Sequence, residues 1–340
     1  MDIATKQKSV LMRQQLNGGN RVYVCQDKLR ETLDREYHYL DSDLKLKRFA
    51  ADELGFVSDC HLLYAVANLG VADTDAITMF NKALHRTAPE LHIMDVNNSD
   101  NVRSRLHALM TSGFLFKITY EVDTFDADNK PRLTHMSLYT CAQDGIYHMN
   151  QVLGKRMVHQ NWIQAKNPYE IVGLAASGYV ASKMALADTF CEFKQGIFQT
   201  KAIGTCFIPA ILKFKYENGE PVHVGVIDAY LNRYEIAQSK GDHEDRCIYK
   251  VNLIKQFLYS RDMKNTVGRA VVVVENNADL VEMADWIMRL DNLGDDLDRV
   301  YFTGEGVHKA GNETSDCFLR IKKAKNKQGY DLVPVKPDFL

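Results

Sequence analysis

The stretch from Ser99 to Tyr139 constrains the fold most, because its hydrophobic period changes abruptly at one glycine. Before Gly113, apolar residues recur every three or four positions, as in a helix with one buried side. Ser99 stands where an N-cap would, and Gly113 stands where a C-cap would. After Gly113, residues 114–120 and 133–139 have strand composition, and polar turn residues lie between them. The stretch therefore predicts a helix followed by a two-stranded hairpin.

Helix, glycine and hairpin in this order are typical of the second half of a winged helix-turn-helix, and residues 58–70 and 72–84 predict its first two helices. Such a module presents a recognition helix and a wing to duplex DNA. We expect Arg103, Ser104 and His107 to face base edges. The full set of predicted DNA-binding residues is Asn101, Arg103, Ser104, Arg105, His107, Lys117, Lys130 and Arg132. The alternative is the same fold used only for protein contacts. The segment 85–98 is longer than a standard turn between the second and third helices.

Composition limits the class of protein. The chain has 340 residues, 46% hydrophobic and 25% charged, with a formal net charge of −2. Any affinity for DNA must then come from local basic surface. Seven scattered cysteines without a C-x-x-C pair argue against a zinc knuckle or a disulfide scaffold and fit a reducing cytoplasm. No apolar run opens the sequence and none is long enough to span a bilayer, so we expect a cytoplasmic protein without a membrane segment.

Composition shifts suggest five segments. They are a basic, helical N-terminal arm (1–57), the winged helix-turn-helix (58–153), connecting helices (154–193), an α/β domain (194–322) and a polar tail (323–340). The arm is predicted either to embrace DNA or to form a solvated packing helix. The small residues 175–178 in the connecting helices fit either core packing or a dimer seam.

The α/β domain is predicted from a clear order of elements. Strands at 206–216 and 221–231 flank an Asn-Gly turn, and a helix at 242–261 follows. The continuous β-branched run at 269–274 indicates a strand covered on both faces. A helix at 278–290 and strands at 299–303 and 317–322 complete the domain. The predicted fold is therefore α/β (α+β), with a mixed sheet flanked by helices.

This order resembles the restriction-endonuclease-like core, in which a Pro-Asp and an acid-x-Lys hold Mg²⁺ and assist the attacking water. Here Ala210 follows Pro209 at the first position, and Asp228 at the second is followed by Ala229-Tyr230. The resemblance implies Asp228 as the metal-binding carboxylate. The lysine would come from Lys250 or Lys255 and a second acid from Glu192 or Asp188, giving the candidate catalytic set Asp228, Lys250, Lys255 and Glu192.

A winged helix joined to such a domain resembles the replication-relaxation proteins and mobilisation relaxases of plasmids and conjugative elements. The residues that carry the resemblance are 101–117, 208–228 and the later helix with Lys255 and Tyr259. The resemblance implies a DNA-binding protein of a mobile genetic element, with double-stranded DNA as its partner and a degenerate nuclease-like domain. One alternative is a Mg²⁺-dependent nickase or relaxase. Another is a transcriptional regulator that forms a homodimer through its C-terminal domain. Nucleotide-binding fingerprints are absent, so no cofactor is expected unless the nuclease-like site holds Mg²⁺.

Overall fold

The computed structural model describes residues 53–87, 99–111, 113–125, 131–158, 168–194, 197–200, 204–208, 210–215, 221–231, 240–260, 267–290, 293–323 and 329–340. Nearly all of the predicted N-terminal arm (1–57) lies outside these residues. Within the described part of the chain, no helix has both the length and the apolar character needed to cross a membrane.

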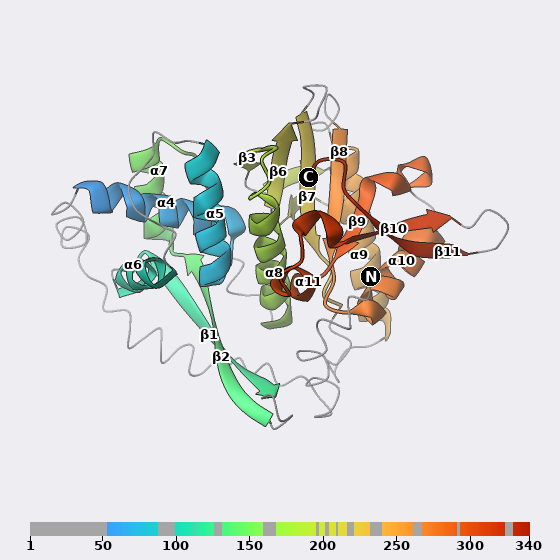
Figure 1. The fold of residues 1–340 in the computed structure, drawn as a ribbon, viewed down its shortest axis with the longest axis horizontal. Helices are drawn as coiled ribbons and strands as arrows, with labels where there is room; N and C mark the ends of the chain where they lie inside the picture. Colours follow the sequence, from blue (N-terminus) through green and yellow to red (C-terminus); the bar gives the residue numbers. More distant parts are fainter. Residues whose placement is uncertain are drawn as a thin grey trace.

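A seven-stranded mixed sheet forms the centre of the C-terminal half (Figure 1). Its strand order is β11-β10-β9-β8-β7-β6-β3. Strands β7, β8 and β9 run parallel, and the other neighbouring pairs are antiparallel. The strands are β3 (Phe190–Lys194), β6 (Ala210–Lys215), β7 (Pro221–Asp228), β8 (Val267–Val273), β9 (Val300–Thr303), β10 (Phe318–Lys323) and β11 (Tyr330–Val335). A separate hairpin joins β4 (Ile197–Thr200) to β5 (Gly204–Phe207). The protein is therefore of mixed α/β class, as the sequence predicts.

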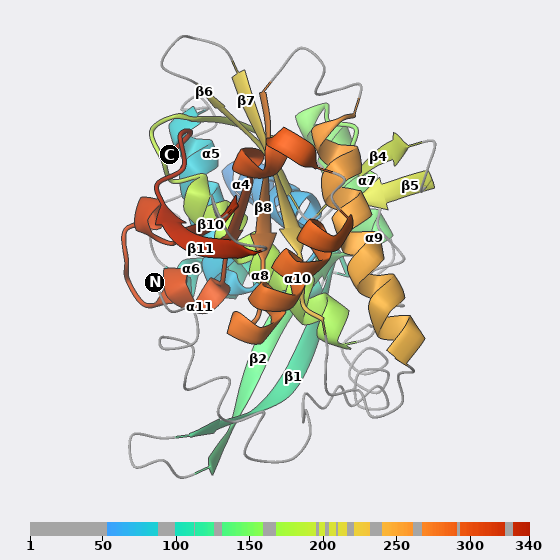
Figure 2. The same cartoon turned by 90° about the vertical axis from the view of Figure 1, so that its right-hand side faces the viewer.

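Helices cover both faces of this sheet (Figures 1 and 2). Helix α8 (Pro168–Met184) packs on one face, and α9 (Lys240–Leu258) and α10 (Asn277–Leu290) pack on the other. Residues 270–274 at the end of the central strand β8 have no exposed surface, which explains their continuous apolar run. On β7, Gly225 lets α9 approach closely, because a Cβ there would lie 2.7 Å from the ring of Phe257. Short helices α11 (Glu305–Lys309), η4 (Gly294–Arg299) and η5 (Thr314–Asp316) complete this half.

In the N-terminal half, the described residues form three helices, a long hairpin and a fourth helix. They are α4 (Glu53–Leu69), α5 (Thr74–Thr87), α6 (Ser99–Thr111), β1 (Leu115–Phe125), β2 (Pro131–Cys141) and α7 (Gln143–Leu153). We call residues 53–158 the head and residues 168–340 the body. Gly113 has a φ of 77°, and its N–H donates to the carbonyl of Met110 at 2.9 Å, so the predicted helix end is confirmed. Strands β1 and β2 pair along their whole length, from Leu115 opposite Cys141 to Phe125 opposite Pro131.

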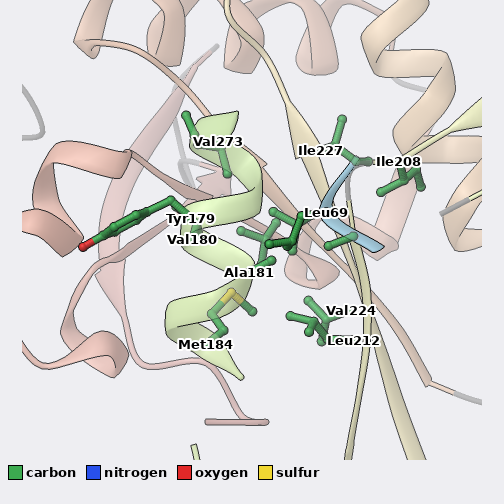
Figure 3. Packing of buried hydrophobic residues seen from close by; sticks show 14 of the residues in the cluster. Leu69, Tyr179, Val180, Ala181, Met184, Ile208, Leu212, Val224, Ile227 and Val273 are labelled. Carbon is green, nitrogen blue, oxygen red and sulfur yellow. The ribbon is translucent and has the colours of Figure 1, made fainter. Parts of the chain in front are cut away.

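Head and body share one hydrophobic core, with α8 between them. Figure 3 shows Leu69 of the head next to Val180 and Ala181 of α8, with Leu212 and Val224 of the sheet nearby. A Cβ at Gly178 would lie 3.4 Å from the carbonyl oxygen of Val71, so the small surface of α8 lets the head approach. The sequence left core packing and a dimer seam as explanations for the small residues 175–178, and packing within the chain accounts for their burial.

Further contacts hold the last turn of α5 against the end of α8. The Arg86 guanidinium donates to the carbonyls of Leu186 at 2.6 Å and Ala185 at 2.9 Å. The rings of Phe80 and Phe193 meet edge to face at 4.5 Å. The head is therefore anchored to the body at both polar and apolar contacts.

Three expectations about individual segments are wrong. Residues 145–153, whose sequence predicts a connector at the end of the winged helix-turn-helix, belong to α7, because Ile146 and Met149 are buried in the core. The expected strand at 206–216 is divided into β5 and β6 around Pro209, which lacks an N–H for a ladder. The expected tail 323–340 holds β11, which pairs with β10, and Phe339 is 1% exposed.

Candidate functional site

A hollow in the described part of the head contains half of the predicted DNA-binding residues. It has a volume of about 700 Å³ and lies between the start of α5, α6 and the hairpin. We call it the head groove. Its lining residues are Asp73, Thr74, Asp75, Arg103, Ser104, His107, Lys117, Ser137 and Tyr139. The structure therefore brings Arg103, Ser104, His107 and Lys117 together on one concave surface.

Helical spacing explains why α6 presents these side chains. Val102, Leu106 and Leu109 are buried in the head core, whereas Arg103, Ser104 and His107 are exposed. Asn101 is exposed at the start of the same helix but does not line the groove. The apolar stripe thus fixes which residues of α6 face outward.

Arg105 has a different position from its neighbours. Its Nε donates to Asp59 Oδ1 at 2.8 Å and its Nη2 to Asp59 Oδ2 at 2.6 Å. Asp59 lies on α4 and is 1% exposed, so the pair ties α6 to the core of the head. Such a two-bond contact of a guanidinium with a carboxylate is directional and strong. Arg105, predicted to bind DNA, is engaged in this bidentate pair.

The groove carries charges of both signs. Arg103 and Lys117 supply cations from α6 and β1, and Asp73 and Asp75 supply carboxylates from the start of α5. Asp73 also accepts the N–H of Ala76 at 2.7 Å and lies 3.6 Å from Lys309 Nζ of α11. Burial raises the pKa of Asp73, although Lys309 acts in the opposite direction. The positive end of the groove is therefore the one formed by α6 and β1.

Two of the predicted DNA-binding residues cannot be located as side chains. Lys130 and the side chain of Arg132 lie outside the described residues, near the tip of the hairpin. The strand bounds alone indicate a hairpin of eleven residues per strand. At about 3.4 Å per residue this corresponds to roughly 35 Å, and Figures 1 and 2 show it extending away from the rest of the head.

In the body, the structure joins two of the predicted catalytic residues. Lys250 Nζ lies 2.6 Å from Asp228 Oδ2, with side-chain exposures of 14% and 9%. Asp228 ends the parallel strand β7, and Lys250 reaches it from α9. A Cβ at Gly173 would lie 3.4 Å from Asp228 Oδ2, so α8 also approaches the carboxylate closely. We call this contact the sheet-edge pair.

The other candidates lie elsewhere. Glu192 is on β3 at the far edge of the sheet, where its Oε2 is 3.6 Å from Lys213 Nζ. Lys255 is five residues after Lys250, and five residues on a helix turn it to a different side. Asp188 is fully exposed and pairs with Arg86 at 3.2 Å. The structure therefore selects Lys250 over Lys255 as the partner of Asp228.

The residues at Asp228 do not fit the Mg²⁺ site that the resemblance implies. Magnesium prefers octahedral oxygen coordination and in nuclease-like sites is bound through carboxylates. Asp228 offers one carboxylate, and its charge is already balanced by Lys250 at hydrogen-bond distance. Glu192, the expected second acid, is on β3, the edge strand of the sheet, and not beside Asp228. No catalytic step through a metal follows from this arrangement.

Sequence reasoning overlooked polar residues that follow the next two parallel strands. Glu275 and Asn276 follow β8 after one residue and are buried, and Asn276 Oδ1 caps α10 by accepting the N–H of Asp279 at 2.9 Å. Thr303 is the last residue of β9, and its Oγ1 lies 3.0 Å from Nε2 of His308, which follows that strand. The carboxyl ends of neighbouring parallel strands lie at the same edge of a sheet. Polar residues at or just after the end of each buried strand could therefore have indicated this cluster from the sequence.

His308 is neutral in the folded protein. It is 1% exposed, and burial together with Lys183 lowers its pKa from 6.5 to about 3. The Thr303 hydroxyl donates to the carbonyl of Cys317 at 2.7 Å, so its oxygen accepts a hydrogen bond from the Nε2–H of His308. These bonds fix the short helix α11 against the sheet edge.

Comparison of the chain with protein-family models, with curated proteins and with solved structures finds no match.

Proposed function

We propose that this protein binds double-stranded DNA through the head groove, with α6 as recognition helix and the β1–β2 hairpin as wing. The observation that carries the proposal is the convergence of Arg103, Ser104, His107 and Lys117 on one exposed concave surface. Arginine, serine and histidine side chains on one side of a helix are suited to base edges and phosphates in a major groove.

The topology of the head supports a winged helix-turn-helix. Three helices precede a hairpin, and the segment between α4 and α5 joins the hairpin through a bridge. In that bridge, the Ala72 N–H donates to the Tyr139 carbonyl at 3.0 Å, and the Tyr139 N–H donates back to Ala72 at 2.8 Å. This bridge fixes the hairpin relative to α5 and α6, so that helix and wing can meet one duplex.

Roles within the interface follow from position. Arg103, Ser104 and His107 contact bases from the exposed side of α6, and Lys117 contacts phosphate from the start of the wing. Arg105 is a positioning residue, because its bidentate bond to buried Asp59 holds α6 in place. Asp75 disfavours phosphate at the other end of the groove, so the duplex enters from the side of α6 and β1.

The body lies next to this groove rather than far from it. Lys309 Nζ is 3.6 Å from Asp73 of the groove, and its helix α11 begins two residues after the end of β9. Two strand spacings, about 10 Å, separate β9 from β7 and the sheet-edge pair. Duplex bound in the head groove would therefore run close to the carboxyl edge of the sheet. We propose a role in replication, mobilisation or regulation of a mobile genetic element, which rests on the resemblance stated for the sequence.

The test is titration of fluorescently labelled duplex DNA with the full-length protein at several salt concentrations. We expect binding that weakens steeply with salt, because phosphate contacts release counterions. Arg103→Ala should weaken binding about tenfold, equivalent to roughly 1.4 kcal/mol. Lys322→Ala, at an exposed position of β10 in the body, is the matched charge control. Absence of binding at low salt, or equal losses in the two variants, would refute the proposal.

A further inference from the structure

A histidine, a cysteine and a glutamate meet between α9 and α10, on the face of the sheet opposite α8. His243 and Cys247 are four residues apart on α9 and therefore lie on the same side of that helix. Glu282 approaches from α10, and the donor atoms of all three residues lie within 4.8 Å of one another. Figure 2 shows the two helices side by side. In the part of the chain that the structure describes, no other group of three such side chains converges in this way.

The distances are close to those of a coordination sphere. Cys247 Sγ lies 3.9 Å from His243 Nε2 and 3.9 Å from Glu282 Oε1, and His243 Nε2 lies 2.6 Å from Glu282 Oε1. Zinc bonds of 2.0 to 2.3 Å in a tetrahedron separate neighbouring ligand atoms by about 3.3–3.6 Å. The sulfur must therefore move inward by a few tenths of an ångström, and the histidine and carboxylate must separate by somewhat less than 1 Å.

Burial shows that two ligands can make this adjustment while the third is fixed. Cys247 has no exposed surface, whereas the side chains of His243 and Glu282 are each 24% exposed. The thiol is thus held in the core, and the other two side chains lie at the surface, where solvent has access. A cation entering from solvent would find three protein ligands and an open fourth position for water.

The surroundings of Cys247 differ from those of other cysteines. Cys141, Cys191 and Cys317 each direct their thiol at a backbone carbonyl, at distances of 3.2 to 3.4 Å. Cys247 has an imidazole and a carboxylate next to its sulfur. Thiolate and imidazole together are ligands that select zinc over the hard cations magnesium and calcium.

We propose that His243, Cys247 and Glu282 form a zinc site that fastens α9 to α10. Binding replaces the His243–Glu282 hydrogen bond by two metal bonds and releases the thiol proton of Cys247 to solvent. The site lies one helical turn before Lys250, so the metal would also fix the segment of α9 that carries the sheet-edge pair. This proposal is independent of DNA binding by the head.

The experiment is metal titration of the full-length protein after treatment with a chelator. Zinc is added in competition with a chromophoric chelator, and Co²⁺ is used as a spectroscopic substitute. We expect one zinc per chain, a rise in melting temperature with zinc, and a sulfur-to-cobalt charge-transfer band with the intense visible bands of four-coordinate cobalt. Cys247→Ser should abolish the charge-transfer band, and Glu282→Gln should weaken zinc binding at least about tenfold.

Matched controls separate the site from adventitious binding. Cys191→Ser removes another thiol, and Glu244→Gln removes a carboxylate next to His243 on the same helix. Both should leave stoichiometry, affinity and spectrum unchanged. Because Glu282 is at the surface, its variant remains informative even if Cys247→Ser destabilises the fold. Binding of no metal, or a band and affinity that survive in Glu282→Gln as in Glu244→Gln, would overturn the proposal.

Discussion

Asp59 in the head and Asp228 in the body are both buried carboxylates, and each has a cationic nitrogen 2.6 Å away. Arg105 binds Asp59 through two nitrogens, one to each carboxylate oxygen, whereas Lys250 meets only one oxygen of Asp228. A guanidinium is always charged, and its planar N–H groups can bind both oxygens of a carboxylate that lies in the same plane. An ammonium is a compact charge whose N–H groups rotate freely. The first contact therefore fixes two helices of the head, and the second restrains a side chain at the end of a parallel strand.

In the proposed interface, a residue that positions the recognition helix can also be distinguished from one that contacts DNA. Arg103 and Arg105 are two residues apart on α6, yet one lines the head groove and the other reaches back to α4. Both are basic residues of a predicted recognition helix. Only the structure shows that Arg105 donates hydrogen bonds to Asp59 within the head. We therefore expect substitutions of the two arginines to differ in their effects on stability and on DNA affinity.

The largest effect is expected from removing the arginine of the head pair. Arg105→Ala leaves Asp59 charged and buried, which should lower the free energy of unfolding by about 3 kcal/mol. We expect the lower end of the usual range because the Arg105 side chain is 32% exposed and water can enter its place. Urea denaturation measures the change. Arg103→Ala, exposed on the same helix, should change stability by less than about 0.5 kcal/mol. Equal effects of the two substitutions would contradict the role given to Asp59.

A smaller loss is expected in the body. Lys250→Met removes a single bond to Asp228 and should lower stability by about 2 kcal/mol, because the carboxylate loses its charged partner. Lys255→Met, on another side of α9, is the matched control and should have little effect. Adding Asp228→Asn to Lys250→Met should restore most of the loss. If the double variant is as unstable as the single one, the pair is not the source of the effect.

Acid stability tests a third buried group, at the edge of the sheet. The folded pKa of His308 is lowered to about 3 from 6.5, so below pH 6.5 the unfolded state binds more protons than the folded state. The contribution of His308 to the free energy of unfolding is therefore fully present above pH 6.5, and it is lost progressively as the pH decreases towards 3. Between pH 7.5 and 5.5, His308 should account for a loss of about 1.4 kcal/mol.

Comparing the protein with His308→Gln isolates this contribution. Burial also lowers the pKa values of His61 and His223, so some loss in acid should remain in the variant. Urea denaturation at the two pH values measures the difference. An acid dependence that is the same in both proteins would mean that His308 is protonated in the folded state.

The sequence predicts elements whose signals are local. The helix before Gly113, the hairpin after it and the run at 269–274 follow from period, turn chemistry and β-branched composition, and all occur near their expected bounds. Helix α7 was missed because its helical signal depends on a distant contact. Gly145 looks like a connector residue, yet α7 needs glycine there, since a Cβ would lie 2.3 Å from the carbonyl oxygen of Phe114.

Strand β11 and the side-chain clusters of the body could not be predicted either, because they depend on contacts between distant segments. Pro334 and the mixed burial of β11 are compatible with an edge strand, but only pairing with β10 makes the segment a strand. Lys250 and Lys255 are equivalent in sequence until the rotation of α9 is known. The cluster of His243, Cys247 and Glu282 depends on how α9 and α10 lie against each other, which no local pattern encodes.

The smallest effect is expected from a phosphate contact at the start of the wing. Lys117 lines the head groove from β1 and is half-buried, so it contributes charge without sequence discrimination. Lys117→Ala should weaken binding to all duplexes by about threefold at moderate salt and reduce the slope of log affinity against log salt by about 1. Arg103→Ala should instead alter the preference among sequences. Salt titrations with two unrelated duplexes distinguish these outcomes, because a sequence-dependent loss in Lys117→Ala would place that lysine against bases and shift the duplex along the groove.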